Sequence, residues 1–299
     1  MTMPWPLGMN TCGQPHESCL PLLIDVGFRY VYLDGTRLEA DDLPASHAAV
    51  QKHADRLIPW SIHLPILFHG WELDEGQVTE RLLRLIGNAA PYGVRNATLH
   101  VPCYSRISPE GFDEERVAAH RGKVMRVIRS GAGRGAEVGI RLNIENGMHA
   151  AAERRPGCCV ASAADLKAYV EAVGAEGVGV CLDTGHAMLS GEDPAQMIRD
   201  LGGLLQETHF NDNFGAFPDR DGAECDYHRP PGIGKIDWLD VMDALEEIDF
   251  PHPVVFEEGM VQVGGDTFEY LARATYDNWR AFERARAKRD GRDPMTLQS

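Results

Sequence analysis

The segment Arg141–Gly147 reads R-L-N-I-E-N-G and shows the pattern that decides the fold. It is a short β-rich run that turns polar at its C-terminal end. Further runs of this kind precede and follow it at regular intervals along the chain. The eight predicted strands are Leu7–Asn10, Tyr30–Asp34, Trp60–Pro65, Ala97–Pro102, Arg141–Asn146, Gly179–Thr184, Glu207–Asp212 and Pro253–Glu258.

Longer stretches of helical character lie between the predicted strands. Apolar residues recur at helical spacing, and Asp193 followed by Pro194 is typical of a helix N-terminus. The predicted helices are Glu75–Ala90, Phe112–Gly131, Asp193 to about Gln206, Asp237–Ile248 and Thr267–Ala287. Alternating β and α units indicate a parallel sheet with helices outside it. The count of eight predicts closure into a (β/α)8 TIM barrel, and an open doubly wound sheet is the alternative.

The chain length and the lack of a linker segment in the sequence favour a single domain. The chain has 299 residues, a length that α/β barrels commonly reach as one unit. No linker or low-complexity segment divides it, so we predict one barrel over 1–299, with its core at about 6–271 and a C-terminal helix and tail at 272–299. Glycines just before strands are expected to end helices as C-caps, namely Gly27, Gly93, Gly139 and Gly177.

The charge balance excludes some classes of partner. Acidic residues number 45 and basic residues 29, which gives a formal net charge of -16. Nucleic-acid binding usually needs a basic surface, so this balance argues against it and fits divalent cations better. Apolar runs stay short of the roughly 20 residues of a membrane span. The N-terminus does not resemble a signal peptide, and seven cysteines without framework spacing indicate reduced thiols, so a cytoplasmic protein is expected.

The C-terminal ends of the predicted strands, with one loop, carry histidines and carboxylates. In a closed barrel these ends converge on one mouth. The residues are His63, His100, Glu145, Asp183, His186, His209, Asp226, His228 and Glu257. A lone histidine at a strand end is more often a hydrogen-bonded structural residue, but this set combines five histidines with four acids. Because packed carboxylates raise one another's pKa, a cation is expected among them. These are ligand types that Zn, Mn or Mg accept.

The motifs around these residues resemble those of the xylose-isomerase-like barrel superfamily. The motifs are N-I-E-N-G at 143–147, C-L-D-T-G-H at 181–186, H-F-N-D-N at 209–213 and D-Y-H-R-P-P-G-I-G-K-I-D-W at 226–238. The resemblance runs from about Pro6 to Leu271. This superfamily includes sugar isomerases, ketose 3-epimerases, inosose dehydratase and metal-dependent apurinic endonucleases.

The epimerase branch of the superfamily implies one divalent metal ion. Its ligands would be Glu145, Asp183, His209 and Glu257, and His186 would contact the substrate. Glu145 and Glu257 would also act as the acid/base pair. The resemblance thus implies an isomerase or epimerase of a sugar, sugar phosphate or polyol, working through a metal-stabilised enediolate.

The endonuclease branch implies a different number of metal ions at the same end of the barrel. Three zinc ions would use all nine histidines and carboxylates, so a multi-zinc phosphoesterase is an alternative function. A keto-polyol dehydratase or lyase on the same carboxylates is another. The sequence also departs from the epimerase pattern H-x-x-x-D-x-x-R, because His209 is followed by F-N-D-N-F-G. Metal number, from one to three, stays open.

Two further residues are candidates for substrate contact. Trp71 ends the apolar run Ile66–Trp71, which is expected either to form a wall over a small ligand or to pack between barrel and helix. Arg229 is a candidate for meeting a phosphate or carboxylate on the substrate. The sequence is compatible with a homo-oligomer and does not fix the oligomeric state.

Overall fold

Eight parallel strands form the centre of the molecule. The computed structural model describes residues 5–68, 70–104, 113–148, 159–216, 225–259 and 265–293. The strands pair in the order β7-β6-β5-β4-β3-β2-β1-β8. Their bounds are β1 (Leu7–Asn10), β2 (Tyr30–Asp34), β3 (Ile58–His63), β4 (Asn96–His100), β5 (Arg141–Glu145), β6 (Val178–Asp183), β7 (Leu205–His209) and β8 (Val254–Phe256).

The two edge strands of this sheet meet where β7 and β8 end. Phe210 and Phe256 form a parallel bridge. The Phe210 amide donates to the Val255 carbonyl at 2.9 Å, and the Glu257 amide donates to the Phe210 carbonyl at 3.0 Å. The predicted (β/α)8 barrel is therefore confirmed, and the open sheet is wrong because its edge strands pair.

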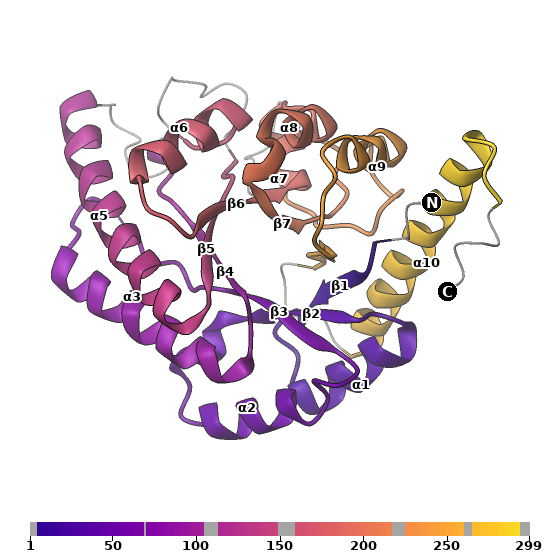
Figure 1. Ribbon diagram of the computed structural model, residues 1–299, viewed down its shortest axis with the longest axis horizontal. Helices are drawn as coiled ribbons and strands as arrows, with labels where there is room; N and C mark the ends of the chain where they lie inside the picture. The colour runs from indigo at the N-terminus through magenta and orange to yellow at the C-terminus, as the bar shows by residue number, and fades with distance from the viewer. Residues whose placement is uncertain are drawn as a thin grey trace.

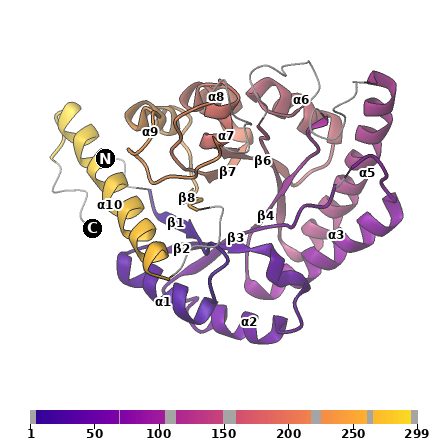
Figure 2. The same ribbon diagram turned by 180° about the vertical axis from the view of Figure 1, so that it is seen from behind.

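Helices surround the strands (Figures 1 and 2). The described helices are α1 (His16–Val26), α2 (Leu43–Gln51), α3 (Glu75–Ala89), α5 (Glu114–Val138), α6 (Ala163–Val173), α7 (Thr184–Leu189), α8 (Pro194–Leu201), α9 (Trp238–Glu247) and α10 (Gly265–Arg289). Short 3-10 turns lie at Gly35–Glu39, Ala90–Tyr92 and Gly202–Leu204. This outer layer covers the strands, and most of their apolar side chains are buried.

Two predicted helix ends need correction. The helix expected to end at Gly131 continues to Val138, because glycine permits close packing there: a Cβ on Gly131 would lie 2.5 Å from Leu82 Cδ2 of α3. Its predicted first residue, Phe112, lies outside the described residues. The helix expected to reach about Gln206 ends at Leu201, since β7 already begins at Leu205.

The predicted glycine caps hold at three of four positions. Gly27, Gly93 and Gly139 are left-handed C-caps, with φ of 116°, 81° and 76°. The prediction for Gly177 is wrong, because Gly174 caps α6. Gly177 also has a positive φ, of 78°, but it lies in the turn that leads into β6.

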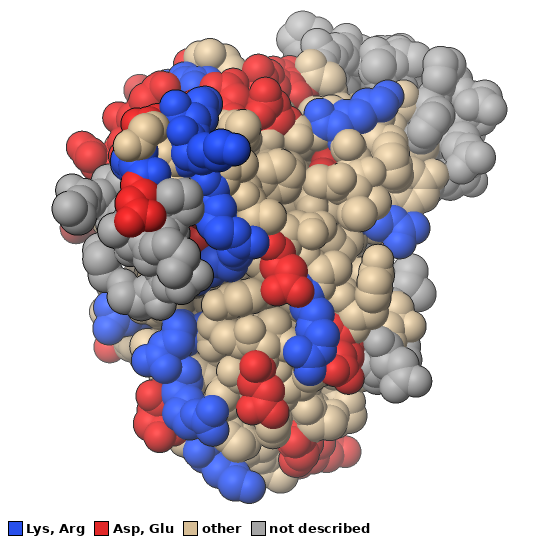
Figure 3. Space-filling view, turned by 90° about the vertical axis from the view of Figure 1, so that its right-hand side faces the viewer, with Lys and Arg blue, Asp and Glu red and all other residues tan. Residues whose placement is uncertain are grey.

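The outer surface carries mixed charge. Arg286 and Arg289 of α10 pair with Asp243 of α9 at 2.6 and 2.8 Å. Figure 3 shows the side that lies at the right of Figure 1, and there Lys and Arg are interspersed with Asp and Glu. Across the described residues, every helix is too short or too polar to cross a membrane.

Candidate metal centre and adjoining cavity

The interior of the barrel is polar at its C-terminal mouth. In β5, side chains alternate between the two faces of the sheet, so Asn143 and Glu145 share one face while Leu142 and Ile144 share the other. The other strands that carry predicted site residues place them at the same end. The structure brings all nine predicted histidines and carboxylates together in three adjoining groups, here called sites 1, 2 and 3.

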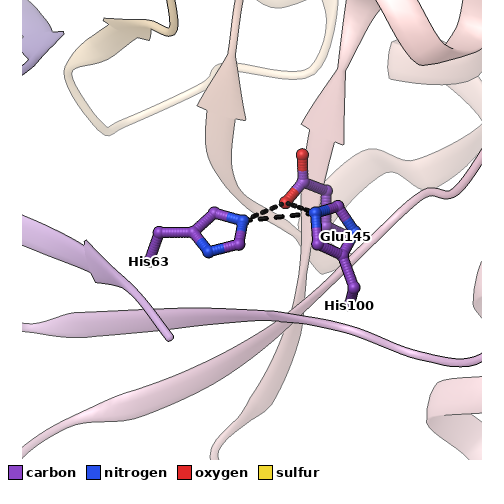
Figure 4. A group of neighbouring side chains, drawn as sticks. All are labelled: His63, His100 and Glu145. Carbon is purple, nitrogen blue, oxygen red and sulfur yellow. Dashed lines mark hydrogen bonds and ion pairs between the residues drawn. The ribbon is translucent and has the colours of Figure 1, made fainter. Parts of the chain in front are cut away.

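Site 1 consists of His63, His100 and Glu145 (Figure 4). Glu145 Oε2 lies 3.3 Å from His63 Nε2 and 3.5 Å from His100 Nε2. The two imidazole Nε2 atoms are 3.2 Å apart. His63 Nδ1 donates to the Leu64 carbonyl at 2.7 Å, which leaves Nε2 as the atom with a free lone pair. Three ligand atoms therefore point at one centre.

Site 2 consists of Glu145, His209 and Glu257. His209 Nδ1 lies 3.2 Å from Glu145 Oε1 and 3.4 Å from Glu257 Oε2. Glu145 thus joins sites 1 and 2 through its two oxygens. The Tyr32 hydroxyl donates to Glu257 Oε1 at 3.0 Å, and its ring packs 4.4 Å from the His209 ring. Tyr32 fixes the orientation of both neighbours.

Site 3 consists of Asp183, His186, Asp226 and His228. Asp226 Oδ2 lies 3.5 Å from His186 Nε2, and Asp226 Oδ1 lies 3.1 Å from His228 Nε2. Each imidazole donates its Nδ1 hydrogen to a backbone carbonyl, His186 to Asn146 and His228 to Glu257, both at 2.9 Å. These bonds set the tautomer that presents Nε2 to the centre.

Asp183 lies with site 3 by its ligand atoms, although the family pattern grouped it with the residues of site 2. It is the N-cap of α7, where Oδ1 accepts the His186 amide at 2.7 Å. Oδ2 accepts from Asn211 Nδ2 at 2.8 Å. Burial raises the pKa of Asp183 to about 6. Among the four predicted carboxylate ligands, Asp183 is therefore the one that is most readily protonated, because the pKa values of Glu145, Asp226 and Glu257 are lowered by neighbouring histidines.

Electrostatic coupling sets the protonation of the remaining groups. Burial opposes the charged form of Glu145, yet the imidazoles of His100 and His209 hold its pKa well below the ordinary value. Burial likewise opposes a charged His228, but Asp226 and other carboxylates raise its pKa to about 10. Without a bound cation, protons on His186, His209 and His228, whose pKa values the neighbouring acidic groups raise, supply the positive charge that these carboxylates need.

The donor set fits a divalent metal ion. Buried polar atoms normally have hydrogen-bond partners, and exceptions call for an explanation such as a bound ion. Within the part of the chain that the structure describes, both oxygens of Glu145 and of Asp226 have no hydrogen-bond donor. The same is true of Nδ1 of His209 and of Nε2 of His186 and His228. These atoms belong to the residues that would hold a metal.

A cavity of about 440 Å³ opens beside sites 1 and 2. This volume suits a small-molecule ligand. Its wall includes Thr11, Tyr32, Asp34, His63, His100 and Glu257. The Thr11 hydroxyl is buried, and among the described residues it has no hydrogen-bond partner. The wall therefore offers hydroxyl and carboxylate groups beside the candidate metal ligands.

Comparison with known protein families matches most of the chain. The model described as xylose isomerase-like TIM barrel matches residues 20–286. The chain belongs to this family. Family membership agrees with the motifs identified in the sequence and with the closed barrel.

Individual relatives of the family differ in activity. A curated inosose dehydratase from Lacticaseibacillus casei is 24% identical over 139 residues, a match covering 44% of this chain and 47% of that protein. The chain thus spans about half the length of the curated relative it matches. The structure of D-psicose 3-epimerase with D-tagatose from Clostridium cellulolyticum H10 has a TM-score of 0.71 at 15% identity, covering 93% of this chain and 99% of that chain. The IOLI protein with a bound zinc atom has a TM-score of 0.68 at 19% identity, covering 95% and 98%. At these identities the two structures show the shared fold.

The two predicted substrate contacts, Trp71 and Arg229, are not among the described residues that line this cavity. Trp71 packs 5.5 Å from the Tyr104 ring, and the Arg116 guanidinium lies 4.4 Å above the Trp71 ring. This arrangement agrees with the packing alternative for the apolar run. Arg229 pairs through its backbone with Asp212, and its guanidinium lies 5.7 Å from the Tyr227 ring.

Three polar residues of the barrel interior were missed in the sequence. Tyr32 and Thr11 line the cavity, and Glu207 lies behind His209. Tyr32 and Glu207 lie inside strands, whereas the pattern that predicted the site residues concerns the polar C-terminal ends of strands. Their signal was the alternation itself, because Glu207 shares a face with His209 two residues later.

Proposed function

We propose that this chain is a metal-dependent isomerase or epimerase of a sugar or related polyol. The observation that carries the proposal is the arrangement of site 2. Two carboxylates, Glu145 and Glu257, both approach His209 Nδ1, at 3.2 and 3.4 Å, beside a cavity of about 440 Å³. Site 2 would hold the cation, with Asp183 as the fourth ligand that the family pattern implies. When bound, a divalent cation supplies polarisation of the substrate carbonyl.

Two carboxylates, Glu257 and Glu145, would carry out the two proton transfers of the reaction. Glu257 lines the cavity and is 8% exposed, whereas Glu145 is fully buried. Glu257 is therefore the carboxylate that removes a proton from the carbon next to the carbonyl. Glu145, once it has taken up a proton from solvent, would return it on the opposite face or at the neighbouring carbon, and Glu257 would then release to solvent the proton that it removed. The Tyr32 hydroxyl, 3.0 Å from Glu257 Oε1, keeps that carboxylate turned toward the cavity.

The remaining wall of the cavity suits a polyhydroxylated ligand. The Thr11 hydroxyl is buried without a partner among the described side chains, so a substrate hydroxyl would satisfy it. Asp34 accepts from the Thr36 amide at 2.8 Å and offers its other oxygen as an acceptor. Such groups bind hydroxyls through hydrogen bonds without requiring a charge on the substrate.

Solvent exchange at the substrate carbon tests this function. Wild-type protein reconstituted with Mn²⁺ or Co²⁺ would be incubated in D2O with a panel of ketohexoses, including D-tagatose, and with inosose. Deuterium incorporation, with an epimer or isomer as the product, is expected for at least one compound. Glu257→Gln and Glu145→Gln should each reduce incorporation by roughly 100-fold or more, as loss of a general acid or base does.

A matched control separates chemistry from folding. Glu283 is also a buried carboxylate and belongs to none of the three sites. It accepts hydrogen bonds from Trp279 at 3.1 Å and from Arg280 at 2.6 Å. Glu283→Gln should leave exchange unchanged. Undiminished exchange in both site 2 variants would overturn the assignment of the acid/base pair. Loss of water from the substrate would instead identify a dehydratase acting through the same carboxylates.

A multi-zinc phosphoesterase is the second candidate, and sites 1 and 3 favour it. An epimerase needs one metal, whereas here three ligand groups adjoin one another through Glu145, which lies 3.7 Å from His186 Nδ1. Three zinc ions per chain and hydrolysis of a phosphodiester such as bis-p-nitrophenyl phosphate would support this function. The net charge of -16 argues against a polyanionic substrate such as DNA.

A further inference from the structure

A buried carboxylate lies directly behind the histidine of site 2. Glu207 and His209 alternate in β7, so both side chains point into the barrel. Both are completely buried. Glu207 Oε1 lies 3.6 Å from His209 Nε2, on the side of the ring opposite to the metal ligands. This is an ion-pair distance, slightly longer than a hydrogen bond.

Neighbouring strands hold the Glu207 carboxylate in place. Its Oε2 accepts from the Thr98 hydroxyl at 2.5 Å and from Asn143 Nδ2 at 3.0 Å. Thr98 and Asn143 are themselves fully buried. A carboxylate in such a position is costly unless its oxygens have donors. Two donors are already used on Oε2, and among the described residues no hydrogen bond reaches Oε1.

The two nitrogens of His209 therefore face different partners. Nδ1 faces Glu145 and Glu257, whereas Nε2 faces Glu207. The Tyr32 ring, 4.4 Å away, packs against the imidazole and restricts its rotation. A histidine ligand commonly donates its second ring hydrogen to a carboxylate, which fixes the tautomer and strengthens the ligand.

We propose that Glu207 is a positioning residue that acts through His209. Its carboxylate accepts the Nε2 hydrogen and thereby keeps the Nδ1 lone pair directed between Glu145 and Glu257. The inference rests on the metal centre of the proposed function and adds to it a residue that neither touches substrate nor binds the cation. Contacts of this kind are often long without the ligand and shorten when it binds.

The same three atoms admit a competing explanation. Cys181 Sγ, Glu207 and His209 offer ligand atoms within 4.8 Å of one another, as a separate metal site would. We favour positioning because Glu207 Oε2 is already occupied by two donors. An additional metal equivalent held by Cys181 is the outcome that would favour the competing site.

Cobalt titration of Glu207→Gln tests the proposal. An amide in this position can donate toward Nε2, which favours the tautomer with its hydrogen on Nδ1. The Co²⁺ dissociation constant, followed by visible absorbance, should rise by roughly 10- to 100-fold. Glu283→Gln is the matched control: Glu283 is also a buried carboxylate, and it accepts from Trp279 at 3.1 Å and from Arg280 at 2.6 Å rather than from a residue of sites 1 to 3. That control should bind Co²⁺ as the wild type does.

The outcomes separate this inference from the proposed function. A folded Glu207→Gln protein with wild-type affinity and spectrum would overturn the positioning role and leave site 2 intact. Wild-type protein that binds no Co²⁺ would overturn the metal centre as well. A normal titration without sugar turnover would overturn only the isomerase. If Glu207→Gln does not fold, Thr98→Val removes one donor to Oε2 and should weaken Co²⁺ binding severalfold; unchanged binding there would overturn the proposal too.

Discussion

Gly35→Ala perturbs site 1 without touching a ligand. Gly35 follows β2 immediately, and β2 pairs with β3 so that Asp34 lies opposite His63. A Cβ placed on Gly35 would lie 1.8 Å from the His63 carbonyl oxygen and 2.8 Å from its carbonyl carbon. The obstacle is backbone rather than a flexible side chain. The substitution must therefore displace the end of β3.

The geometry gives the size of the effect. Contacts to a real Cβ are essentially never shorter than 3.0 Å, so an oxygen at 1.8 Å must move by about 1.2 Å. Overpacking of this kind typically costs about 1–3 kcal/mol, which lowers Tm by a few degrees at about 2–4 °C per kcal/mol. Metal–ligand distances are held to within about 0.2 Å, and His63 Nε2 lies 3.3 Å from Oε2 of Glu145, which also belongs to site 2. The shift of His63 should therefore disturb Glu145 and weaken metal binding at site 2 by roughly tenfold or more.

Thermal melting and Co²⁺ titration measure the two effects. The control is Gly133→Ala, because a Cβ at this helical glycine has no neighbour within 4 Å. Gly133→Ala should raise stability by about 0.5–1 kcal/mol and leave metal binding unchanged. The reasoning is refuted if Gly35→Ala melts and binds Co²⁺ like the wild type, because β2 and β3 would then not approach as described.

Three further predictions concern packing, metal and pH. Gly135→Ala should lower Tm, because a Cβ on Gly135 would lie 2.3 Å from the Ile140 carbonyl oxygen. Gly133→Ala in the same helix should not lower it, and equal Tm values for the two variants would contradict the prediction. Zn²⁺ at about 100 times its dissociation constant should stabilise the fold by about 2.7 kcal/mol, and EDTA should reverse this effect. A Tm that changes with neither Zn²⁺ nor EDTA would contradict the metal site. Burial lowers the pKa of His228, but the neighbouring carboxylates outweigh this effect and raise it to about 10. The protonated imidazole therefore stabilises the metal-free fold fully below about pH 6.5, the pKa in the unfolded chain, and this stabilisation is lost as the pH rises toward 10. Tm in EDTA at pH 6.5 and 9.5 measures this contribution, and His228→Gln should reduce the difference; an unreduced difference would contradict the assignment.

The barrel could be predicted because strand order and strand number follow from a local pattern. β1 and β2 begin and end where the apolar-to-polar runs do. Helix bounds were less predictable, because α5 continues through glycines that tertiary packing requires. The start of α6 has a local signal that is independent of apolar periodicity, the capping box formed by Ser162 and Asp165.

The candidate site could be predicted only in part. Ligand types at strand ends identified the residues, and convergence at the mouth follows from barrel closure. Which ligand joins which centre depends on side-chain rotamers and on partners from distant strands, so the grouping of Asp183 had no local signal. The position of Glu207 behind His209 was indicated only by the strand face that the two residues share. Trp71 packs on Tyr104 and Arg116, which agrees with one of the two alternatives for its apolar run, and its contact with a substrate stays a prediction.

Anomalous diffraction from crystals grown with Zn²⁺, Mn²⁺ or Co²⁺ tests the central claim most directly. The account predicts an anomalous peak at site 2, at about 2.0–2.3 Å from His209 Nδ1 and from oxygens of Glu145 and Glu257. Additional peaks at sites 1 and 3 would support the multi-metal alternative. Crystals saturated with each of these ions that show these side chains gathered but no peak among them would contradict the account.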